Sequence, residues 1–167
     1  MSKHLPDYMS EDLFTIDYRK LHEAGVRGIA VDIDNTLVPM HRAHADERAR
    51  KWAYDMKKMG FSVVILSNAS RKRTEAFMKD MGVLGIWLSG KPLPGAYLRA
   101  AAMMGLDPGN CAMIGDQLFT DIRGGKKAGF FTILTRPLDT REILFVRLKR
   151  LLERPFLKKH GERIQRI

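Results

Sequence analysis

Carboxylate, hydroxyl, amide and ammonium side chains follow four short apolar runs of this sequence, each at the point where a run ends. They are Asp32 and Asp34 after the first run, Ser67 and Asn68 after the second, Lys91 after the third, and Asp116 and Asp121 after the fourth. If the runs are neighbouring parallel strands, their carboxyl ends meet at one edge of a sheet, where ligands bind in open α/β folds. We therefore expect these side chains to converge on one site.

Phosphoryl transfer through an aspartyl phosphate is the chemistry that this set suits. A carboxylate at a strand end, such as Asp32, can attack phosphorus. Asp34, two residues later, can protonate the leaving oxygen and then activate water. Clustered carboxylates repel one another unless a cation neutralises them, and ligands that are all oxygen favour Mg²⁺. A hydroxyl and an ammonium, here Ser67 and Lys91, can hold the other phosphate oxygens.

Each of these signals is weak when it stands alone. Acidic pairs after strands often cap loops, Ser-Asn pairs commonly form turns, and most lysines are solvated surface residues. Their order along the chain and their place on successive strand ends favour a functional site.

The elements that must position these residues alternate along the chain. Apolar runs typical of strands buried on both faces occur at 28–31, 62–66, 85–88, 111–114 and 130–134. Amphipathic stretches that predict helices lie at about 43–59, 70–81, 94–104, 118–128 and 140–153. This alternation predicts an α/β fold in which helices cover both faces of a parallel sheet. Expected helix boundaries are a Ser70 cap, Pro94 in a first turn, and C-terminal glycines at Gly60, Gly82, Gly105 and Gly129.

The composition limits the class of protein. With 167 residues, 45% of them hydrophobic and 29% charged, the sequence predicts one globular domain over 1–167. The single cysteine, Cys111, excludes a disulfide framework and fits a reducing compartment. With no long apolar run and no secretory signal pattern, the expected location is cytoplasmic. A formal net charge of +10 indicates an anionic partner.

The four sets of residues resemble the motifs of the haloacid dehalogenase (HAD) superfamily. Asp32-Ile33-Asp34-Asn35-Thr36 is similar to its first motif, and Ser67, Lys91 and Gly115-Asp116-Gln117 with Asp121 match the other three in order. The resemblance covers about residues 26–135. It implies a three-layer Rossmann-like fold with sheet order 5-4-1-2-3.

The resemblance also implies roles for these residues. Asp32 is then the nucleophile and Asp34 the general acid and base, with Ser67, Asn68 and Lys91 as phosphate-binding residues. Mg²⁺ is expected at Asp32, the backbone carbonyl of Asp34 and Asp116, with Asp121 behind these ligands or joined to the ion through water. Because the dehalogenases of the superfamily lack the second aspartate, Asp34 favours a phosphatase.

A narrower resemblance is to the YqeG-type group of subclass IIIA. It rests on Leu66-Ser67-Asn68-Ala69, Gly90-Lys91-Pro92, the Asp116 segment and the leader Leu5-Pro6-Asp7. Eukaryotic members of that group dephosphorylate phosphatidylglycerophosphate, a precursor of cardiolipin, so the resemblance implies a lipid substrate. The alternative is a small soluble ester such as a sugar or nucleotide phosphate.

The spacing of the motifs leaves no room for a cap domain. Only 32 residues separate Asp34 from Ser67, and 23 separate Ser67 from Lys91. We therefore expect a capless enzyme with an open site, which suits a large substrate such as a lipid headgroup. Oligomerisation that lets a neighbouring subunit cover a small substrate is the other way to close such a site.

Two further segments carry charge. His41-Arg42-Ala43-His44 could contact substrate or bind a metal, and the role of the two histidines is left open. Segment 140–167 is basic and amphipathic, with a stripe of Leu144, Leu148, Leu151 and Leu152. Such a helix either packs on the sheet or lies on an anionic membrane, which would place the protein peripherally at the inner membrane face.

Two other classes of function compete with a phosphatase. A phosphorylation switch also forms an aspartyl phosphate, but receiver domains place the acceptor on the third strand and lack a second aspartate two residues later. A ribosome- or RNA-associated protein could use the basic tail, but the tail shows no interleaved aromatic residues, so nucleic acid is the less favoured partner.

Overall fold

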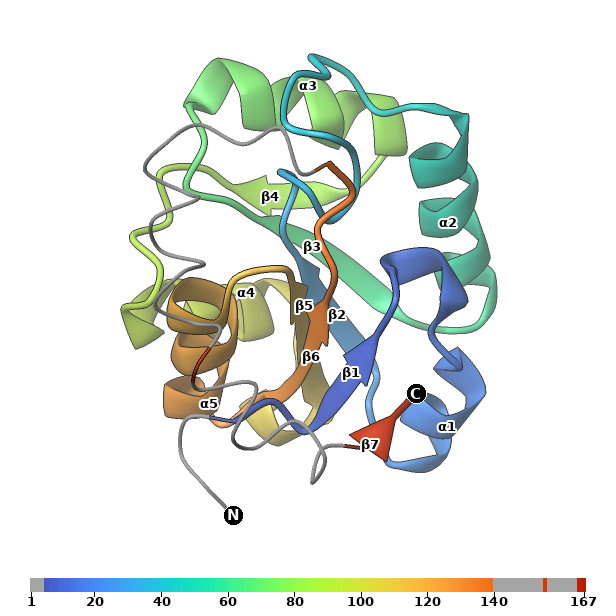
Figure 1. Cartoon of the computed structure of the whole chain (residues 1–167), viewed down its shortest axis with the longest axis vertical. Helices are drawn as coiled ribbons and strands as arrows, with labels where there is room; N and C mark the ends of the chain where they lie inside the picture. The colour runs from blue at the N-terminus through green and yellow to red at the C-terminus, as the bar shows by residue number, and fades with distance from the viewer. Residues whose placement is uncertain (1–4, 140–154, 156–164) are drawn as a thin grey trace.

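A seven-stranded parallel sheet forms the centre of the protein in the computed structural model, which describes residues 5–139, 155 and 165–167 (Figure 1). The strands run in the order β4-β3-β2-β5-β6-β1-β7, and every pair is parallel. Their bounds are β1 Tyr8–Ser10, β2 Gly28–Val31, β3 Ser62–Leu66, β4 Leu84–Ile86, β5 Cys111–Gly115, β6 Phe131–Thr135 and β7 Gln165–Arg166.

Helices cover both faces of the sheet, as the alternating pattern predicts. Helices α1, α2 and α3 lie on one face, and α4 and α5 lie on the other (Figure 1). Their bounds are α1 Tyr18–Glu23, α2 Glu47–Lys58, α3 Arg71–Met81, α4 Pro94–Met104 and α5 Arg123–Ala128. Short 3-10 turns lie at η1 Leu13–Thr15 and η2 Pro108–Asn110, and a π-helical turn, η3, spans Leu118–Ile122.

The predicted α/β fold is confirmed, with two additions at one edge. The five predicted strands occupy β6-β5-β2-β3-β4, which is the expected order 5-4-1-2-3. Strands β1 and β7, which the sequence did not indicate, extend the sheet beyond β6. The strand expected at 85–88 ends at Ile86, and the helix expected from 43 begins at Glu47. The helix predicted at 140–153 lies outside the described residues.

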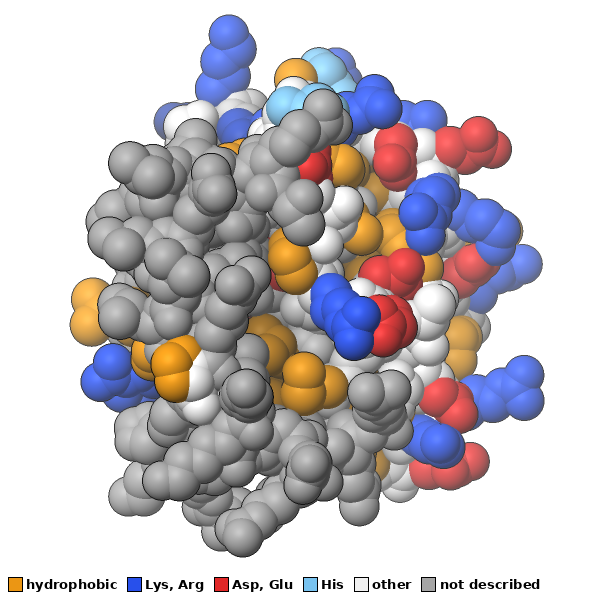
Figure 2. Space-filling model, in the orientation of Figure 1, with side chains coloured by type: hydrophobic (Ala, Val, Ile, Leu, Met, Phe, Trp, Pro, Cys, Tyr) orange, Lys and Arg blue, Asp and Glu red, His pale blue; other side chains and the backbone are white. Residues whose placement is uncertain are grey.

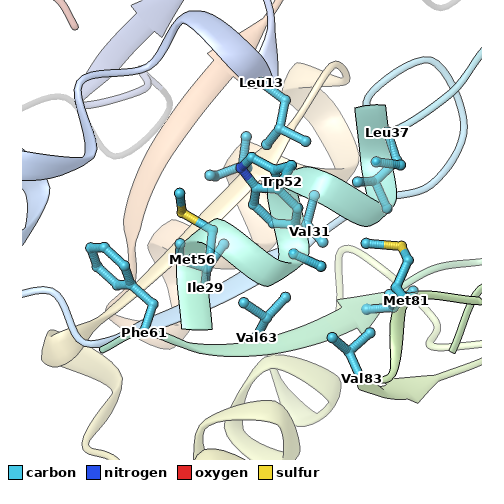
Figure 3. Close-up of a cluster of buried hydrophobic side chains, with 14 of the residues drawn as sticks. Leu13, Ile29, Val31, Leu37, Trp52, Met56, Phe61, Val63, Met81 and Val83 are labelled. Atoms are coloured by element: carbon cyan, nitrogen blue, oxygen red, sulfur yellow. The ribbon is translucent and has the colours of Figure 1, made fainter. Parts of the chain in front are cut away.

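The larger core joins the sheet to α2. Ile29, Val31 and Val63 point from the sheet towards Trp52 and Met56 of α2 (Figure 3). Alternation along β2 sends Ala30 to the opposite face, where a second cluster contains Tyr97 of α4 and Ala128 of α5. Since both faces of the central strands are covered, these strands are apolar along their whole length.

Strand β1 is fixed by an aspartate just before it. Asp7 accepts hydrogen bonds from the Thr132 backbone N–H at 2.8 Å and from the Thr132 hydroxyl at 3.0 Å. It also pairs with Lys126 of α5. These contacts dock a three-residue strand that is too short to show a hydrophobic period.

No cap interrupts the fold between the predicted motifs. Residues 35–66 form a short loop, α2 and β3, and residues 68–90 form α3, β4 and the loops around them. Within the described residues, the segments that follow β2, β3 and β4 at the carboxyl edge of the sheet are loops and not an inserted domain. Within the described residues, no helix is long and apolar enough to cross a membrane.

Candidate active site

The central strand of the sheet presents the first carboxylate. Asp32 follows β2 directly, and its backbone N–H donates to the Ile114 carbonyl of β5 at 3.1 Å. The backbone of Asp32 is thus tied to the neighbouring strand, and its side chain is buried. Placed in the middle of the sheet edge, Asp32 can be reached from the loops after β3, β4 and β5.

Three buried carboxylates and one buried ammonium form the centre of the site. Carboxylate oxygens of Asp32, Asp116 and Asp121 lie within 4.8 Å of one another. The Lys91 Nζ lies 2.9 Å from Asp32 Oδ1 and 2.7 Å from Asp121 Oδ1. One ammonium offsets only one of the three negative charges, so the cluster can accommodate a further cation.

The charges of this cluster shift one another's protonation. Burial lowers the pKa of Lys91, but attraction to Asp121 and Asp32 outweighs it and holds the pKa above its usual range. Burial raises the pKa of Asp121 to about 6, although Lys91 opposes the shift. Lys91 therefore stays charged at neutral pH and can attract an anion into the site.

A π-helical turn directs Asp121 back towards the sheet. The N–H groups of Asp121 and Ile122 both donate to the Gln117 carbonyl, at 3.0 and 3.3 Å. In return, Asp121 Oδ2 accepts the Gln117 N–H at 3.1 Å. A Cβ at Gly115 would lie 2.2 Å from Asp121 Oδ2, so only glycine fits beside this carboxylate.

The loop after β3 holds the loop that carries Lys91. Ser67 is buried, and its Oγ accepts the Ala69 N–H at 3.1 Å. The Asn68 side chain accepts the Lys91 N–H at 3.0 Å and donates to the Lys91 carbonyl at 3.2 Å. Ser89 also donates to Asn68 at 2.9 Å. The structure thus brings all predicted residues to one edge, with the Asn68 amide bound to the Lys91 loop.

Asp34 lies at the entrance and is partly buried. Its carboxylate accepts from Arg73 Nη2 of α3 at 2.7 Å. Burial and the negative charge of Asp32 raise the pKa of Asp34, and the Arg73 guanidinium opposes this shift. An aspartate that takes up a proton more easily is suited to proton transfer.

Arg73 is the residue of this site that the sequence analysis missed. Besides Asp34, its guanidinium donates to the carbonyls of Met40, at 3.2 Å, and Arg42. Arg73 therefore joins α3 to the segment 39–45, which we call the flap. The available signal was that Arg73 lies in the first turn of α3, the helix that follows the loop of Ser67. Surface arginines are common at such positions, so the signal did not single it out.

The two histidines of the flap lie against different carboxylates. His41 Nδ1 is 3.6 Å from Asp139, and His44 Nδ1 is 2.9 Å from Asp80 of α3. Histidine and basic side chains lie together at the top of the surface view (Figure 2). Among the described residues, the grouping that could hold a metal is the aspartate cluster, and it contains neither histidine.

Comparison with known proteins places this site in a family. Residues 45–129 match the haloacid dehalogenase-like hydrolases. The chain is also 39% identical over 153 residues to the protein described as probable phosphatase YqeG of Bacillus subtilis (strain 168), covering 92% of this chain and 89% of that protein. The chain belongs to the haloacid dehalogenase-like hydrolases. It is an enzyme, a HAD-type phosphatase that acts on phosphomonoesters.

A second relative carries a more specific name. The chain is 29% identical over 165 residues to phosphatidylglycerophosphate phosphatase 1, chloroplastic/mitochondrial, of Arabidopsis thaliana. The match includes 93% of this chain but only 47% of the plant protein. This chain therefore spans about half the length of that plant protein.

Solved structures share the fold. The 3-deoxy-D-manno-octulosonate 8-phosphate phosphatase of Moraxella catarrhalis, solved with magnesium and phosphate ions, aligns with a TM-score of 0.56. Sequence identity is 18%, and the alignment covers 74% of this chain and 76% of that one. The cobalt-bound phosphatase YrbI of Haemophilus influenzae also gives a TM-score of 0.56 at 15% identity, covering 85% and 92% of the two chains. At these identities the likeness shows the fold alone.

The aspartate cluster has the donor set of a divalent cation site. Its oxygen ligands are those that Mg²⁺ and similar hard cations prefer. All three carboxylates are buried, where uncompensated negative charge is costly. The residues present therefore fit the divalent metal ion on which this kind of phosphatase depends.

Proposed function

We propose that this protein is a Mg²⁺-dependent phosphatase that hydrolyses a phosphomonoester through a phosphoaspartate on Asp32. The observation that carries the proposal is the Lys91 ammonium, held 2.9 Å from Asp32 inside a cluster of buried carboxylates. A phosphate dianion attracted by Lys91 lies beside the carboxylate that attacks it. The proximity of nucleophile and anion-binding group supports in-line attack from Asp32.

The first step forms the covalent intermediate. An Asp32 carboxylate oxygen bonds to phosphorus while the bond from phosphorus to the ester oxygen breaks. Asp34 gives its proton to that oxygen, so the product leaves as a neutral alcohol. The raised pKa of Asp34 favours the protonated form that this step requires.

The second step returns the enzyme to its starting state. Asp34, now a carboxylate, takes a proton from water, and the water oxygen bonds to phosphorus. The bond between phosphorus and Asp32 breaks, which releases inorganic phosphate and restores both carboxyl groups. Lys91 and the Ser67 hydroxyl hold the other phosphate oxygens in both steps.

The proposed ligands of Mg²⁺ are Asp32, Asp116 and the backbone carbonyl of Asp34, with Asp121 beside them. When bound, the ion supplies positive charge that lessens repulsion between the aspartates and the phosphate. Thr36, whose hydroxyl donates to Asp116 Oδ1 at 3.4 Å, helps to orient that ligand.

Phosphatidylglycerophosphate is the substrate that we propose. The plant relative carries this lipid in its name, and its match spans 93% of the present chain. The fold supports the proposal because, in the part of the chain that the structure describes, no inserted domain lies over the carboxyl edge of the sheet, which leaves room for a headgroup on a membrane to reach Asp32. A small sugar or nucleotide phosphate, covered by a neighbouring subunit, is the alternative.

A substrate panel tests the proposal. The purified full-length protein is assayed with Mg²⁺ on phosphatidylglycerophosphate in detergent micelles and on sugar phosphates and nucleotide monophosphates. We expect the highest kcat/KM on the lipid, loss of activity in EDTA and recovery with Mg²⁺. A higher kcat/KM on a soluble ester would show that this ester, and not the lipid, is the substrate. Full activity of Asp32→Asn would overturn the mechanism.

A further inference from the structure

Two leucines beside the active site are strongly exposed. Leu88 is 68% exposed and Leu93 is 65% exposed, the largest fractions among the exposed large hydrophobic residues of the described chain. They flank the segment Ser89-Gly90-Lys91 that carries the buried ammonium. Exposed apolar side chains on both sides of an anion-binding residue indicate a surface that meets an amphipathic partner.

The backbone holds both leucines in fixed positions relative to the site. The Leu88 N–H donates to the Ala69 carbonyl at 3.0 Å, two residues after Ser67. The Leu93 N–H donates to the Gly90 carbonyl at 2.9 Å. Leu88 has a φ of 42°, in the left-handed region that disfavours a residue with a Cβ. The loop thus keeps an apolar residue exposed even though its backbone conformation is unfavourable.

Positive charge and an aromatic ring adjoin this loop. The Arg71 guanidinium, at the start of α3, lies 5.0 Å from the centre of the Trp87 ring. Its side chain is exposed, as is that of the neighbouring Lys72. Tryptophan, exposed leucine and arginine together are the residue types that contact the boundary between headgroups and acyl chains of a membrane.

We propose that Trp87, Leu88, Leu93 and Arg71 form a docking rim that seats the active site on an anionic phospholipid surface. The inference rests on the proposed function and names the partner of that same site. Leu88 and Leu93 enter the interfacial layer, and Arg71 attracts anionic headgroups. The Lys91 ammonium, on the loop between the two leucines, is buried against Asp32 and Asp121, so a headgroup phosphate must enter the site to reach it.

Charge and position favour a membrane over a second copy of this chain. The protein carries a net charge of +10, so two copies repel each other whereas an anionic surface attracts one. The rim also lies on the loop that carries Lys91, whose Nζ is 2.9 Å from Asp32. A lipid substrate that reaches Asp32 must therefore come close to this loop, and a second copy bound there would compete with it.

Two substitutions can remove the apolar character of the rim without weakening the fold. Asparagine tolerates the left-handed conformation of Leu88 better than leucine does. Leu93 occupies the N-cap of α4 and makes no side-chain capping bond, so serine there adds a preferred cap. The test variant is therefore Leu88→Asn with Leu93→Ser. The matched control is Leu84→Thr, a 53% exposed leucine at the opposite, amino end of β4.

Vesicle binding is measured without any substrate present. The full-length protein is co-sedimented with vesicles of phosphatidylglycerol and phosphatidylcholine, and with phosphatidylcholine alone. We expect binding to the anionic vesicles, a loss of roughly tenfold or more in the double variant, and no change in Leu84→Thr. If the double variant binds the vesicles as well as the wild type does, the docking rim is refuted. A change in oligomeric state that accompanies the loss of binding would refute it as well.

Activity then separates this inference from the proposed function. The double variant should lose turnover of phosphatidylglycerophosphate in vesicles but keep turnover of the same lipid in detergent micelles. Equal loss in vesicles and micelles would contradict a docking role. If the wild-type protein does not hydrolyse the lipid in micelles, the proposed substrate is refuted instead. The vesicle-binding result would still decide whether the docking rim binds a membrane.

Discussion

Asp34 lies between charges of opposite sign, and this balance bears on the role that we propose for it in both steps of the reaction. Burial and the Asp32 carboxylate raise its pKa, whereas Arg73, 2.7 Å away, lowers it. An acid with too low a pKa cannot protonate the leaving oxygen, and a base with too high a pKa stays protonated when water must be activated. We therefore regard Arg73 as a positioning residue for Asp34.

Replacement of Arg73 by glutamine tests this balance. Loss of the cation removes the influence that lowers the pKa of Asp34, so its pKa should rise further. Because the first step needs protonated Asp34, the alkaline limb of the kcat/KM profile should move to higher pH. Loss of orientation should lower kcat by about tenfold to a hundredfold, as measured on a generic phosphomonoester across pH.

The control for this variant is Arg50→Gln. Arg50 also donates to a backbone carbonyl, that of Ala45 at 2.7 Å, but it lies on α2 and pairs with no catalytic carboxylate. Its pH profile should match that of the wild type, and Arg73→Lys should recover part of the lost kcat. An unchanged alkaline limb in Arg73→Gln would show that Arg73 only supports the flap.

At the scale of elements, the π-helical turn Leu118–Ile122 connects the fold to the site. It returns Asp121 to Gly115 so closely that no side chain fits between them. Helix α4 stabilises the position of this turn, because the Tyr97 hydroxyl donates to the Thr120 carbonyl at 2.9 Å. A change at Gly115 should therefore reach the proposed metal site through Asp121.

We expect Gly115→Ala to weaken metal binding. The added Cβ would lie 2.2 Å from Asp121 Oδ2, so the carboxylate must move away from Lys91 and Asp32. Displacement of a residue beside metal ligands should raise the Mg²⁺ concentration needed for half-maximal activity by roughly tenfold or more. Titration of EDTA-treated protein with Mg²⁺ measures the shift.

Gly95→Ala is the matched control. Gly95 is exposed in α4, and a Cβ there meets no atom within 4 Å. This variant should keep the wild-type Mg²⁺ requirement and gain about 0.5 kcal/mol in the free energy of unfolding. If Gly115→Ala has the same Mg²⁺ requirement as Gly95→Ala, Asp121 has no part in binding the ion.

The sequence predicted the central strands and helices because their signals are local. Continuous apolar runs mark β2, β3 and β5, and the glycines after α3 and α4 take the expected left-handed conformation, with φ of 61° at Gly82 and 67° at Gly105. Strand β1 escaped prediction because the contacts that hold it, from Asp7 to Thr132, join residues far apart in the chain.

The same reasoning explains the outcome for the site. Asp32, Ser67, Lys91 and Asp116 could be placed because strand ends of a parallel sheet converge on one edge. Arg73 could not be placed in this way, because its role depends on the rotation of a helix and on a flap that folds over it. The chemistry that we propose for each residue stays a prediction, and the variants above test it.

For the whole molecule, we expect net charge and an accessible site to act together. The net charge of +10 includes the basic segment 140–167, which lies almost entirely outside the described residues. Figure 2 shows basic and acidic side chains interspersed over the right side of the view, where α1 and α2 lie in Figure 1. We predict that the excess of positive charge in the tail sequence adds a second attraction to an anionic surface, besides that of the docking rim.

Charge reversal in the tail should affect vesicle substrates selectively. Each basic residue near an anionic leaflet contributes about 1 kcal/mol to binding, less when salt screens it. Reversal of Arg147, Lys149, Arg150 and Arg154 to glutamate should lower vesicle binding and turnover of the vesicle lipid. Turnover of a soluble phosphomonoester should be spared.

The effect of salt separates the tail from the docking rim. High salt should release the wild-type protein from anionic vesicles, and the reversed variant should keep only the smaller salt dependence that Arg71 of the docking rim contributes. Loss of both activities together would show that the tail supports the fold. If the wild-type protein binds no vesicles and the reversed variant keeps both activities, the tail contributes nothing to a lipid-directed enzyme.

The central claim is that Asp32 carries the phosphoryl group during turnover. Rapid acid quenching of the enzyme with radiolabelled phosphomonoester, followed by peptide mapping, measures this directly. We predict label on Asp32 that appears and decays on the timescale of turnover, and none in Asp32→Asn. Label on another residue, or a phosphoenzyme that persists for minutes while product continues to form, would contradict the account.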